Sequence, residues 1–306
     1  MSKKQIIVIC GPTASGKTNL GIKIANKIDG EIISCDSMQI YKDMDIGTAK
    51  PTIEEQNEAK HHLIDFVSPD KRYSVSEYKK DAEAKIKEIL KNNKTPIIVG
   101  GTGLYLNSLV YGIEYPDIET DLKYRKELEQ RVEKEGLDKL YNEAKKIDNI
   151  AIERVSSNDK KRILRILELY HSTGKTKTEL EIESRKNEVK YDYKIFVLNM
   201  DREKLYDRIN KRVDIMIKNG LIEEVQKILK KYKEFPTAMQ GLGYKEVVEY
   251  LENKTTKEEM IEKIKQESRR YAKRQITWFK SYKNAIWLDA LKNNNVYTIL
   301  EEISEK

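Results

Sequence analysis

The octapeptide that most constrains the fold of this chain reads Gly11-Pro12-Thr13-Ala14-Ser15-Gly16-Lys17-Thr18. It directly follows the apolar run 6–10, which is typical of a buried strand, and it precedes a helix-like stretch at 19–28. Successive backbone N–H groups of such a loop wrap a phosphate, and the start of the helix adds partial positive charge. Lys17 would reach the outer phosphate, and the Thr18 hydroxyl would hold Mg²⁺. The order of strand, loop and helix therefore predicts a di- or triphosphate site rather than a chance glycine-rich turn.

Four further apolar runs are typical of buried parallel strands, at 32–35, 97–99, 195–198 and 285–288. Charged segments with helical character separate them, for example 76–92 and 202–219. This alternation predicts an α/β fold, a P-loop NTPase-like parallel sheet flanked by helices. Because ligands bind such sheets at the carboxyl ends of the strands, the residues directly after each strand are the first site candidates.

The alternation stops between about Tyr115 and Tyr193, where no strand-like run occurs and apolar residues recur at helical spacing. We interpret this stretch as an all-helical insertion between two strands of the core. The predicted organisation is therefore a P-loop α/β core of residues 1–114 and 194–306, with basic C-terminal helices, and a helical insertion domain of residues 115–193.

Composition limits the compartment and the cofactors. Only two cysteines and three histidines occur in 306 residues, too few for a zinc site at their spacing, so Cys10 and Cys35 are expected to be small buried residues in a reducing cytosol. The apolar run 6–10 is too short for a secretory signal or a membrane span. We therefore expect a cytoplasmic protein without a membrane partner. The paired His61 and His62 suggest packing more than metal binding, because adjacent side chains point to different sides.

Polar residues follow three of the predicted strands. Asp36 comes after the second strand, where a carboxylate can hold Mg²⁺, accept a proton from a nucleophile, or simply cap the next turn. In the turn 100–103, three glycines permit close backbone approach and leave the Thr102 hydroxyl in the cleft, although a plain strand-to-helix turn fits equally. After the fourth strand, Arg212 could reach a leaving phosphate, whereas Arg208 is interpreted as a solvated helix charge.

Two basic clusters indicate a polyanionic partner. The chain has 58 Lys and Arg against 51 Asp and Glu, and ten of the basic residues lie in 254–283, interleaved with aromatic side chains. A second cluster comprises Lys160, Lys161, Arg162 and Arg165 in the insertion. Either cluster alone is typical of a solvated helix face. Two clusters in a chain that also has a phosphate loop favour RNA, which is bound through phosphate contacts and base stacking.

Together these residues resemble the bacterial tRNA dimethylallyltransferase (tRNA isopentenyltransferase) family. The resembling segments are GPTASGKT at 11–18, DSMQIYKDMDIGTAKP at 36–51, HHLID at 61–65, YSVSEY at 73–78, GGTGLY at 100–105, NDKKRILRILE at 158–168, AMQGLGYKE at 238–246 and YAKRQITWF at 271–279. Many kinases share the phosphate loop, but the combination in this order is specific. The turn 154–159 departs from the family pattern, which often has His-Pro or Asn-Pro before the Asn-Asp pair, and the zinc-finger segment of eukaryotic relatives is absent from this sequence.

The resemblance implies transfer of the dimethylallyl group from dimethylallyl diphosphate to the N6 amine of adenosine at tRNA position 37, next to the anticodon, with release of diphosphate. Residues 11–18 would hold the diphosphate, with Mg²⁺ at Thr18. Three residues would be catalytic: Asp36 accepts a proton from the amine or orients it, Thr102 contacts the reacting groups, and Arg212 neutralises the diphosphate.

The resemblance also implies that the anticodon stem-loop of tRNA is the partner of a monomeric enzyme, with the target base flipped into a channel. The residues implied to contact tRNA are Asp36, Ser37, Met38, Gln39, Thr102, Tyr124, Lys161, Arg162, Ile163, Leu164, Arg165, Arg270, Lys273, Arg274, Gln275 and Trp278.

Three alternatives share parts of this pattern. A small-molecule or nucleotide kinase explains the phosphate loop but neither the basic clusters nor the turn 100–105. An adenylate prenyltransferase of the cytokinin type needs no long basic C-terminal segment. A non-enzymatic RNA-binding NTPase switch would need a guanine-specificity motif such as N-K-x-D, which this sequence lacks.

Overall fold

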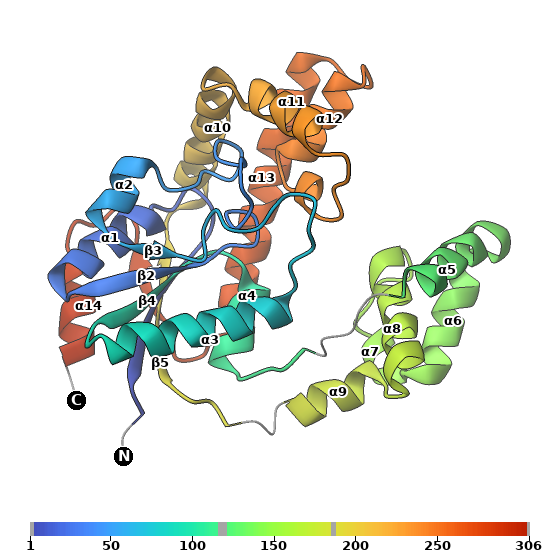
Figure 1. Cartoon of the computed structure of the whole chain (residues 1–306), viewed down its shortest axis with the longest axis horizontal. Coiled ribbons are helices and arrows are strands. Elements are labelled where there is room, and N and C mark those ends of the chain that lie inside the picture. Colours follow the sequence, from blue (N-terminus) through green and yellow to red (C-terminus); the bar gives the residue numbers. More distant parts are fainter. Residues whose placement is uncertain (1–2, 116–120, 185–187, 305–306) are drawn as a thin grey trace. The chain divides into compact units, whose positions relative to one another are not determined.

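The computed structural model describes residues 3–115, 121–184 and 188–304 of the chain. The chain divides into two compact units, one formed by the residues up to 106 together with those from 190 onward, the other by residues 107–189. The first unit contains the sheet and the second is helical (Figure 1). Each unit is described by itself below.

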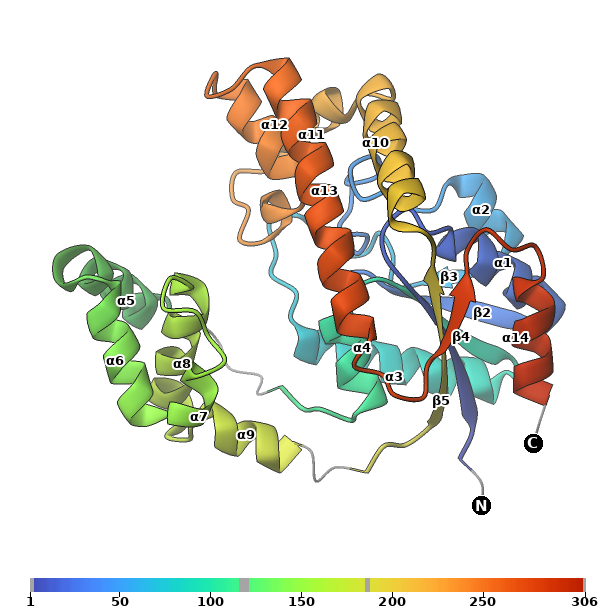
Figure 2. The ribbon, with the colours of Figure 1, turned by 180° about the vertical axis from the view of Figure 1, so that it is seen from behind.

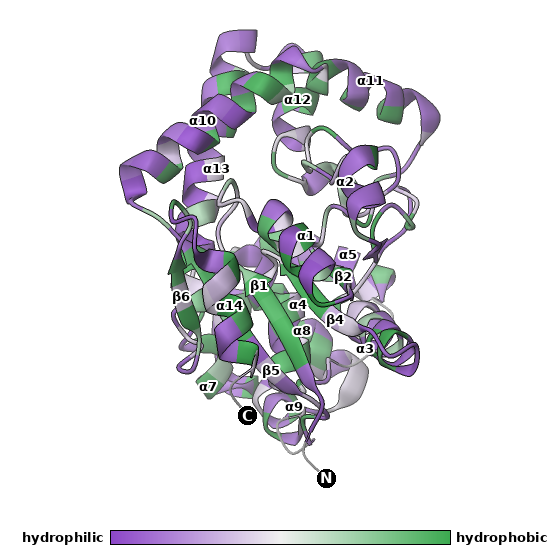
Figure 3. Cartoon of the chain, turned by 90° about the vertical axis from the view of Figure 1, so that its left-hand side faces the viewer, coloured by the Kyte–Doolittle hydropathy of each residue, from purple (hydrophilic) through white to green (hydrophobic). Residues whose placement is uncertain are grey.

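Within the described residues, six strands form one parallel sheet in the order β3-β2-β4-β1-β5-β6. In chain order the strands are β1 (Gln5–Cys10), β2 (Gly30–Cys35), β3 (His61–His62), β4 (Thr95–Gly100), β5 (Asp192–Asn199) and β6 (Ile286–Asp289). All five runs predicted to be strands form strands, and the predicted parallel α/β sheet is confirmed. The central strand β1 is hydrophobic along almost its whole length (Figure 3), as expected for a strand covered on both faces.

Helices cover both faces of the sheet. The helices of this unit are α1 (Lys17–Lys27), α2 (Ile53–Glu58), α3 (Val75–Lys91), α4 (Gly103–Val110, which continues into the second unit), α10 (Arg202–Lys218), α11 (Leu221–Lys231), α12 (Tyr244–Leu251), α13 (Lys257–Phe279) and α14 (Asn295–Ser304), with a 3-10 turn at Ala238–Gln240. Alternate strand residues such as Ile7 and Ile9 pack with α1 and α14 on one face. Helix α3 lies on the opposite face (Figures 1 and 2). Because side chains alternate along a strand, both helical layers bury apolar residues of the same strands.

A second core fixes the loop 36–51, which follows β2. Apolar residues of α10 to α13 pack around Tyr41 and Met44 of this loop. The carboxylate of Glu224 on α11 accepts the backbone N–H groups of three successive loop residues, 45–47, at 2.8–3.2 Å, and the Tyr244 hydroxyl donates to it at 2.6 Å. The loop is therefore held by charge-assisted hydrogen bonds as well as by packing.

The second unit has its own hydrophobic core. Its helices are α5 (Leu122–Glu135), α6 (Leu137–Ile147), α7 (Asn149–Ile152), α8 (Lys160–Thr173) and α9 (Lys177–Ser184). Buried residues of α5, α6, α7 and α8 form one cluster, with Leu128 and Leu140 fully buried. The division between the units falls at 106/107 and 189/190, whereas the sequence placed it at 114/115 and 193/194. The second difference arises because β5 already begins at Asp192, which pairs with Gln5.

The two cysteines and the paired histidines lie inside the first unit. Cys10 and Cys35 are buried free thiols, and burial raises the pKa of Cys35 to about 12. His61 lies beside the carbonyl of Ala59, whereas His62 Nε2 lies 2.6 Å from the carboxylate of Glu31. In the described part of the chain, no group of three His, Cys, Asp or Glu residues could hold a metal, and no helix is long and apolar enough to cross a membrane.

We expect replacement of Glu31 by Gln to reduce stability in a pH-dependent way. Burial by itself raises the pKa of Glu31, but hydrogen bonds from His62, Lys94 and Lys60 outweigh it and lower the pKa to about 2. A carboxyl group with a lowered pKa stabilises the fold above its ordinary pKa of 4.5, and this contribution is lost as the pH falls toward 2. Chemical denaturation should show a loss of about 1–3 kcal/mol at pH 7 that shrinks in acid. Exposed Glu58→Gln is the control, and a loss that does not depend on pH would contradict this assignment.

Candidate active site

The phosphate loop has the backbone that anion binding requires. Gly11 has φ 151° and Gly16 has φ 93°, both in the region that favours glycine, and a Cβ on Gly11 would lie 2.5 Å from the carbonyl oxygen of Leu198. Helix α1 begins at Lys17, so the N–H groups of its first turn point toward the loop. The buried Ser15 hydroxyl has no hydrogen-bond partner among the described residues. A phosphate oxygen would provide the partner that this hydroxyl lacks.

A cavity of about 430 Å³ opens beside this loop, at the carboxyl ends of β1, β2 and β4. Its lining includes the following side chains from four separate segments of the first unit: Thr13, Lys17, Thr18, Asp36, Arg212 and Gln275. The structure thus brings together the loop, the carboxylate after β2 and the arginine of α10, as the strand-end argument predicts.

Three cationic groups lie around the cavity. Lys17 Nζ donates to the carbonyl of Pro12 at 2.8 Å, and burial, together with the charge of Arg212, lowers the pKa of Lys17 to about 8. Arg212 Nη1 lies 3.4 Å from Thr13 Oγ1, and burial lowers the pKa of this guanidinium as well. Arg208 is exposed, as the sequence suggested, yet it lines the cavity. Two of these cations, Lys17 and Arg212, are desolvated. Cations gathered near a helix start favour a polyanionic ligand.

The position of Arg208 at the cavity was not predicted, although the sequence contains a signal for it. Arg208 and Arg212 are four residues apart on α10, so they lie on one helix face. Because Arg212 lines the cavity, Arg208 on the same face of α10 lies at the cavity as well.

Asp36 caps a turn and also faces the cavity. Its Oδ1 accepts the N–H groups of Met38 at 2.9 Å and Gln39 at 3.3 Å. The negative charge of Asp36 opposes, but does not cancel, the lowering of the pKa values of Lys17 and Arg212 by burial. The capping alternative is thus realised, and the carboxylate still lines the cavity beside the cations.

Thr102 connects the turn after β4 to the turn after β2. Its Oγ1 accepts the N–H of Ser37 at 3.0 Å and lies 3.3 Å from Ser37 Oγ. The side chain of Tyr271 on α13 also lies beside Thr102. A Cβ on Gly100 would lie 2.1 Å from the carbonyl oxygen of Cys35, so only glycine permits this approach of the two strand ends. The pairing of the strands thus brings Thr102 next to the segment that begins with Asp36.

The remaining residues implied to contact RNA fall into different environments. Gln39 is tied to its own loop by hydrogen bonds to the carbonyls of Thr48 and Ala49, and Met38 packs closely against Gly241. On α13, three basic residues are exposed and Trp278 is 38% exposed: Arg270, Lys273 and Arg274. Gln275 is only 5% exposed, and its amide bonds to backbone groups.

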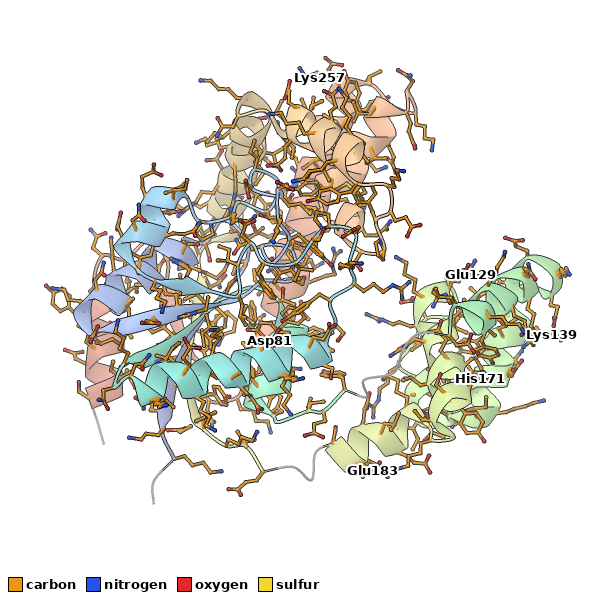
Figure 4. All side chains as sticks on the ribbon, in the orientation of Figure 1. Asp81, Glu129, Lys139, His171, Glu183 and Lys257 are labelled. Atoms are coloured by element: carbon orange, nitrogen blue, oxygen red, sulfur yellow. The ribbon has the colours of Figure 1, made fainter. Side chains whose placement is uncertain are left out.

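In the helical unit, Lys161 and Arg162 are exposed on α8 and Arg165 is 42% exposed. The Tyr124 ring stacks on His171, with ring centroids 3.7 Å apart (His171 is labelled in Figure 4). Ile163 and Leu164 are fully buried in the core of this unit. Their side chains therefore hold α8 in place. Beside them, Arg162 and Arg165 form ion pairs with Asp159 and Glu168.

The oxygen ligands that Mg²⁺ prefers are present in the cavity. The Thr18 hydroxyl and the Asp36 carboxylate both line it. Mg²⁺ ordinarily takes one or two protein oxygens together with substrate phosphates and water, so these residues fit a metal–diphosphate complex.

Comparisons with known proteins agree on one family. The model of the family described as IPP transferase matches residues 39–282. A tRNA dimethylallyltransferase of Acetivibrio thermocellus is 50% identical, with 93% of this chain and 91% of the relative aligned. One of Clostridioides difficile is 48% identical over 99% of this chain and 97% of the relative.

Solved structures show the same likeness. The full-length tRNA isopentenylpyrophosphate transferase of Bacillus halodurans is similar with a TM-score of 0.73 and 39% identity, covering 99% of this chain and 96% of that one. A eukaryotic dimethylallyltransferase acting on tRNA has a TM-score of 0.78 and 32% identity, covering 98% of this chain and 77% of its own.

Proposed function

This chain belongs to the IPP transferase family, and we propose that it transfers the dimethylallyl group of dimethylallyl diphosphate to the N6 amine of adenosine at tRNA position 37, releasing diphosphate. Dimethylallyl transfer to tRNA is the activity for which its full-length relatives are named. The observation that carries the finer assignment is the single cavity that joins Lys17, Arg212, Asp36 and the phosphate loop. This cavity pairs a diphosphate site with a carboxylate suited to an amine.

Departure of the diphosphate is assisted by the loop and the cations. The bond between the allylic carbon and the diphosphate oxygen breaks, leaving negative charge on the diphosphate and positive character on the carbon. Loop N–H groups, Lys17 and Arg212 stabilise the negative charge as it develops. Mg²⁺, held through Thr18, would supply further neutralisation of the diphosphate.

Asp36 and Thr102 act on the accepting base. The exocyclic amine of adenine is a weak nucleophile because its lone pair is delocalised into the ring. Asp36 accepts a proton from this amine as the new carbon–nitrogen bond forms, or orients it for attack. Thr102, held by its hydrogen bond with Ser37, positions the base beside this carboxylate.

The basic and aromatic faces serve the RNA. We propose that Arg270, Lys273 and Arg274 bind phosphates of the anticodon stem-loop, together with Lys161 and Arg165 of the insertion, and that the target base is flipped out of its stack. We also propose that the enzyme works as a monomer in the cytoplasm. The positive net charge of +7 suits a polyanionic partner of this kind.

Transfer of labelled dimethylallyl from its diphosphate to an anticodon stem-loop with three consecutive adenosines tests the activity. ATP is included as a competing donor and AMP as a competing acceptor. We expect label in the RNA, none in AMP, and no phosphate transfer from ATP. Label in AMP alone would indicate an adenylate prenyltransferase, and phosphate transfer without prenylation would indicate a kinase.

We expect the double change Lys161→Ala and Arg165→Ala to weaken tRNA binding and flatten its salt dependence. Each phosphate contact that is lost lowers the slope of log affinity against log salt by about one. Fluorescence titration at several salt concentrations measures this slope. The matched control is Lys139→Ala with Lys145→Ala on α6 (Lys139 is labelled in Figure 4), which are exposed in the same unit. An unaltered slope in the first pair would show that these side chains do not touch phosphate.

A further inference from the structure

One face of α13 contacts three residues of the turn 100–103. Tyr271, Gln275 and Trp278 are spaced i, i+4 and i+7, so they share a face of the helix. Tyr271 lies beside Thr102, and the Trp278 ring lies so close to Gly103 that a Cβ there would be 2.5 Å from it. Gln275 donates to the carbonyl of Gly101 in the same turn.

The Gln275 side chain joins two loops that are far apart in sequence. Its Oε1 accepts the N–H of Thr13 in the phosphate loop at 2.8 Å. Its Nε2 donates to the carbonyl of Gly101 at 2.9 Å, in a buried hydrogen bond. The phosphate loop offers a donor, the N–H of Thr13, and the turn 100–103 offers an acceptor, the carbonyl of Gly101. An amide side chain of this length satisfies both groups. An ionised carboxylate would satisfy only the donor, and an alkyl chain neither.

The same contact extends to the cation that faces the diphosphate. Gln275 holds the backbone of Thr13, and the hydroxyl of Thr13 lies 3.4 Å from Arg212. A Cβ on Gly101 would lie 2.3 Å from Gln275 Nε2, so position 101 must be glycine for the amide to fit in this place. With both polar atoms engaged and 5% of its surface exposed, Gln275 has little left to offer an RNA strand.

We propose that Gln275 is a positioning residue that sets the spacing between the phosphate loop and the turn bearing Thr102. Its amide thereby fixes how far the diphosphate lies from the accepting amine, an inference that rests on the proposed function. The sequence resemblance implied an RNA contact instead. A displacement of about 1 Å between reacting groups can cost about 10²-fold in rate, so a clamp of this kind has a large kinetic effect.

The test compares Gln275→Met, which keeps the length of the side chain but removes both hydrogen bonds, with Gln266→Met, an exposed position on the same helix. For Gln275→Met we expect kcat to fall about 10²-fold. We also expect magnesium diphosphate, titrated calorimetrically, to bind about tenfold more weakly, while the Kd for tRNA changes less than about twofold. Weaker tRNA binding with unchanged diphosphate binding would overturn the proposal in favour of a direct RNA contact, and so would the absence of any effect.

A double-mutant cycle keeps the proposal testable if Gln275→Met is poorly folded. Gly101→Ala is expected to weaken diphosphate binding because its methyl group displaces the Gln275 amide. In a Gln275→Ala background that amide is gone, so Gly101→Ala should then cost much less. Additive effects would overturn the proposal. Because diphosphate binding needs no prenyl transfer, this result stands even if the wild-type chain fails to prenylate RNA, a failure that would count against the proposed function alone.

Discussion

Replacing Asp36 by Asn is expected to lower the rate of dimethylallyl transfer about 10²- to 10⁴-fold, the range for loss of a general base, with nearly unchanged affinity for tRNA. Asn keeps the side-chain oxygen that accepts the N–H groups of Met38 and Gln39, so the turn survives. Only the negative charge that accepts a proton from the amine, or orients it, is removed. Single-turnover transfer to a labelled stem-loop, with tRNA affinity measured separately, tests both parts of this expectation.

Two further variants define what this result means. Asp36→Ala removes the turn contacts as well as the charge, so we expect it to weaken tRNA binding more than Asp36→Asn does. Asp207→Asn, at an exposed position of α10, controls for the loss of one charge elsewhere. Wild-type turnover in Asp36→Asn would remove this carboxylate from the mechanism.

Replacing Lys17 by Met should lower kcat/KM for dimethylallyl diphosphate about 10²- to 10³-fold, the range observed when one donor to a developing oxyanion is lost. Lys17 lies in the cavity at the start of α1, so its ammonium group meets the departing diphosphate rather than the RNA. Steady-state kinetics with each substrate varied in turn should therefore show the loss on the diphosphate side. Lys23→Met on the exposed side of the same helix is the matched control.

The same substitution should raise the thermal stability of the ligand-free protein. Burial lowers the pKa of Lys17 to about 8 from its ordinary 10.5, so the folded state disfavours the charged form. This penalty is fully present below pH 8 and disappears as the pH rises through 10.5. A higher Tm for Lys17→Met at pH 7, together with lost activity, would show that the desolvated Lys17 ammonium destabilises the ligand-free fold and is kept for its interaction with the diphosphate. A lower Tm would contradict that view.

Long apolar runs made the sheet predictable. Each of the five predicted strands is a buried run, and the motif order identified the family that the comparisons confirm. Strand β3 was missed because it has only two residues, His61 and His62, and pairs at the edge of β2. A segment this short and polar carries no periodic signal, so its strand geometry comes from the neighbouring strand.

Tertiary contacts explain what the sequence could not reveal about the site. The motif containing Gln275 was visible, but motif position alone could not distinguish a residue that touches RNA from one that ties two loops together. Likewise, Ile163 and Leu164 lie within a basic segment, yet the helical period turns them into the core of the insertion. Side-chain roles inside a motif depended on which face of the helix is buried, and this required the packed structure.

The arrangement of strands also determines when during synthesis the site can exist. Strand β1 pairs with β4 and with β5, and the whole insertion is synthesised between those two partners. The insertion has its own core, so it can fold while the sheet still lacks β5 and β6. Arg212 and Gln275 leave the ribosome later still. A nascent chain that ends before α10 carries a complete phosphate-loop sequence, yet it lacks the arginine and the glutamine that complete the site, so catalysis begins only after most of the chain has been made.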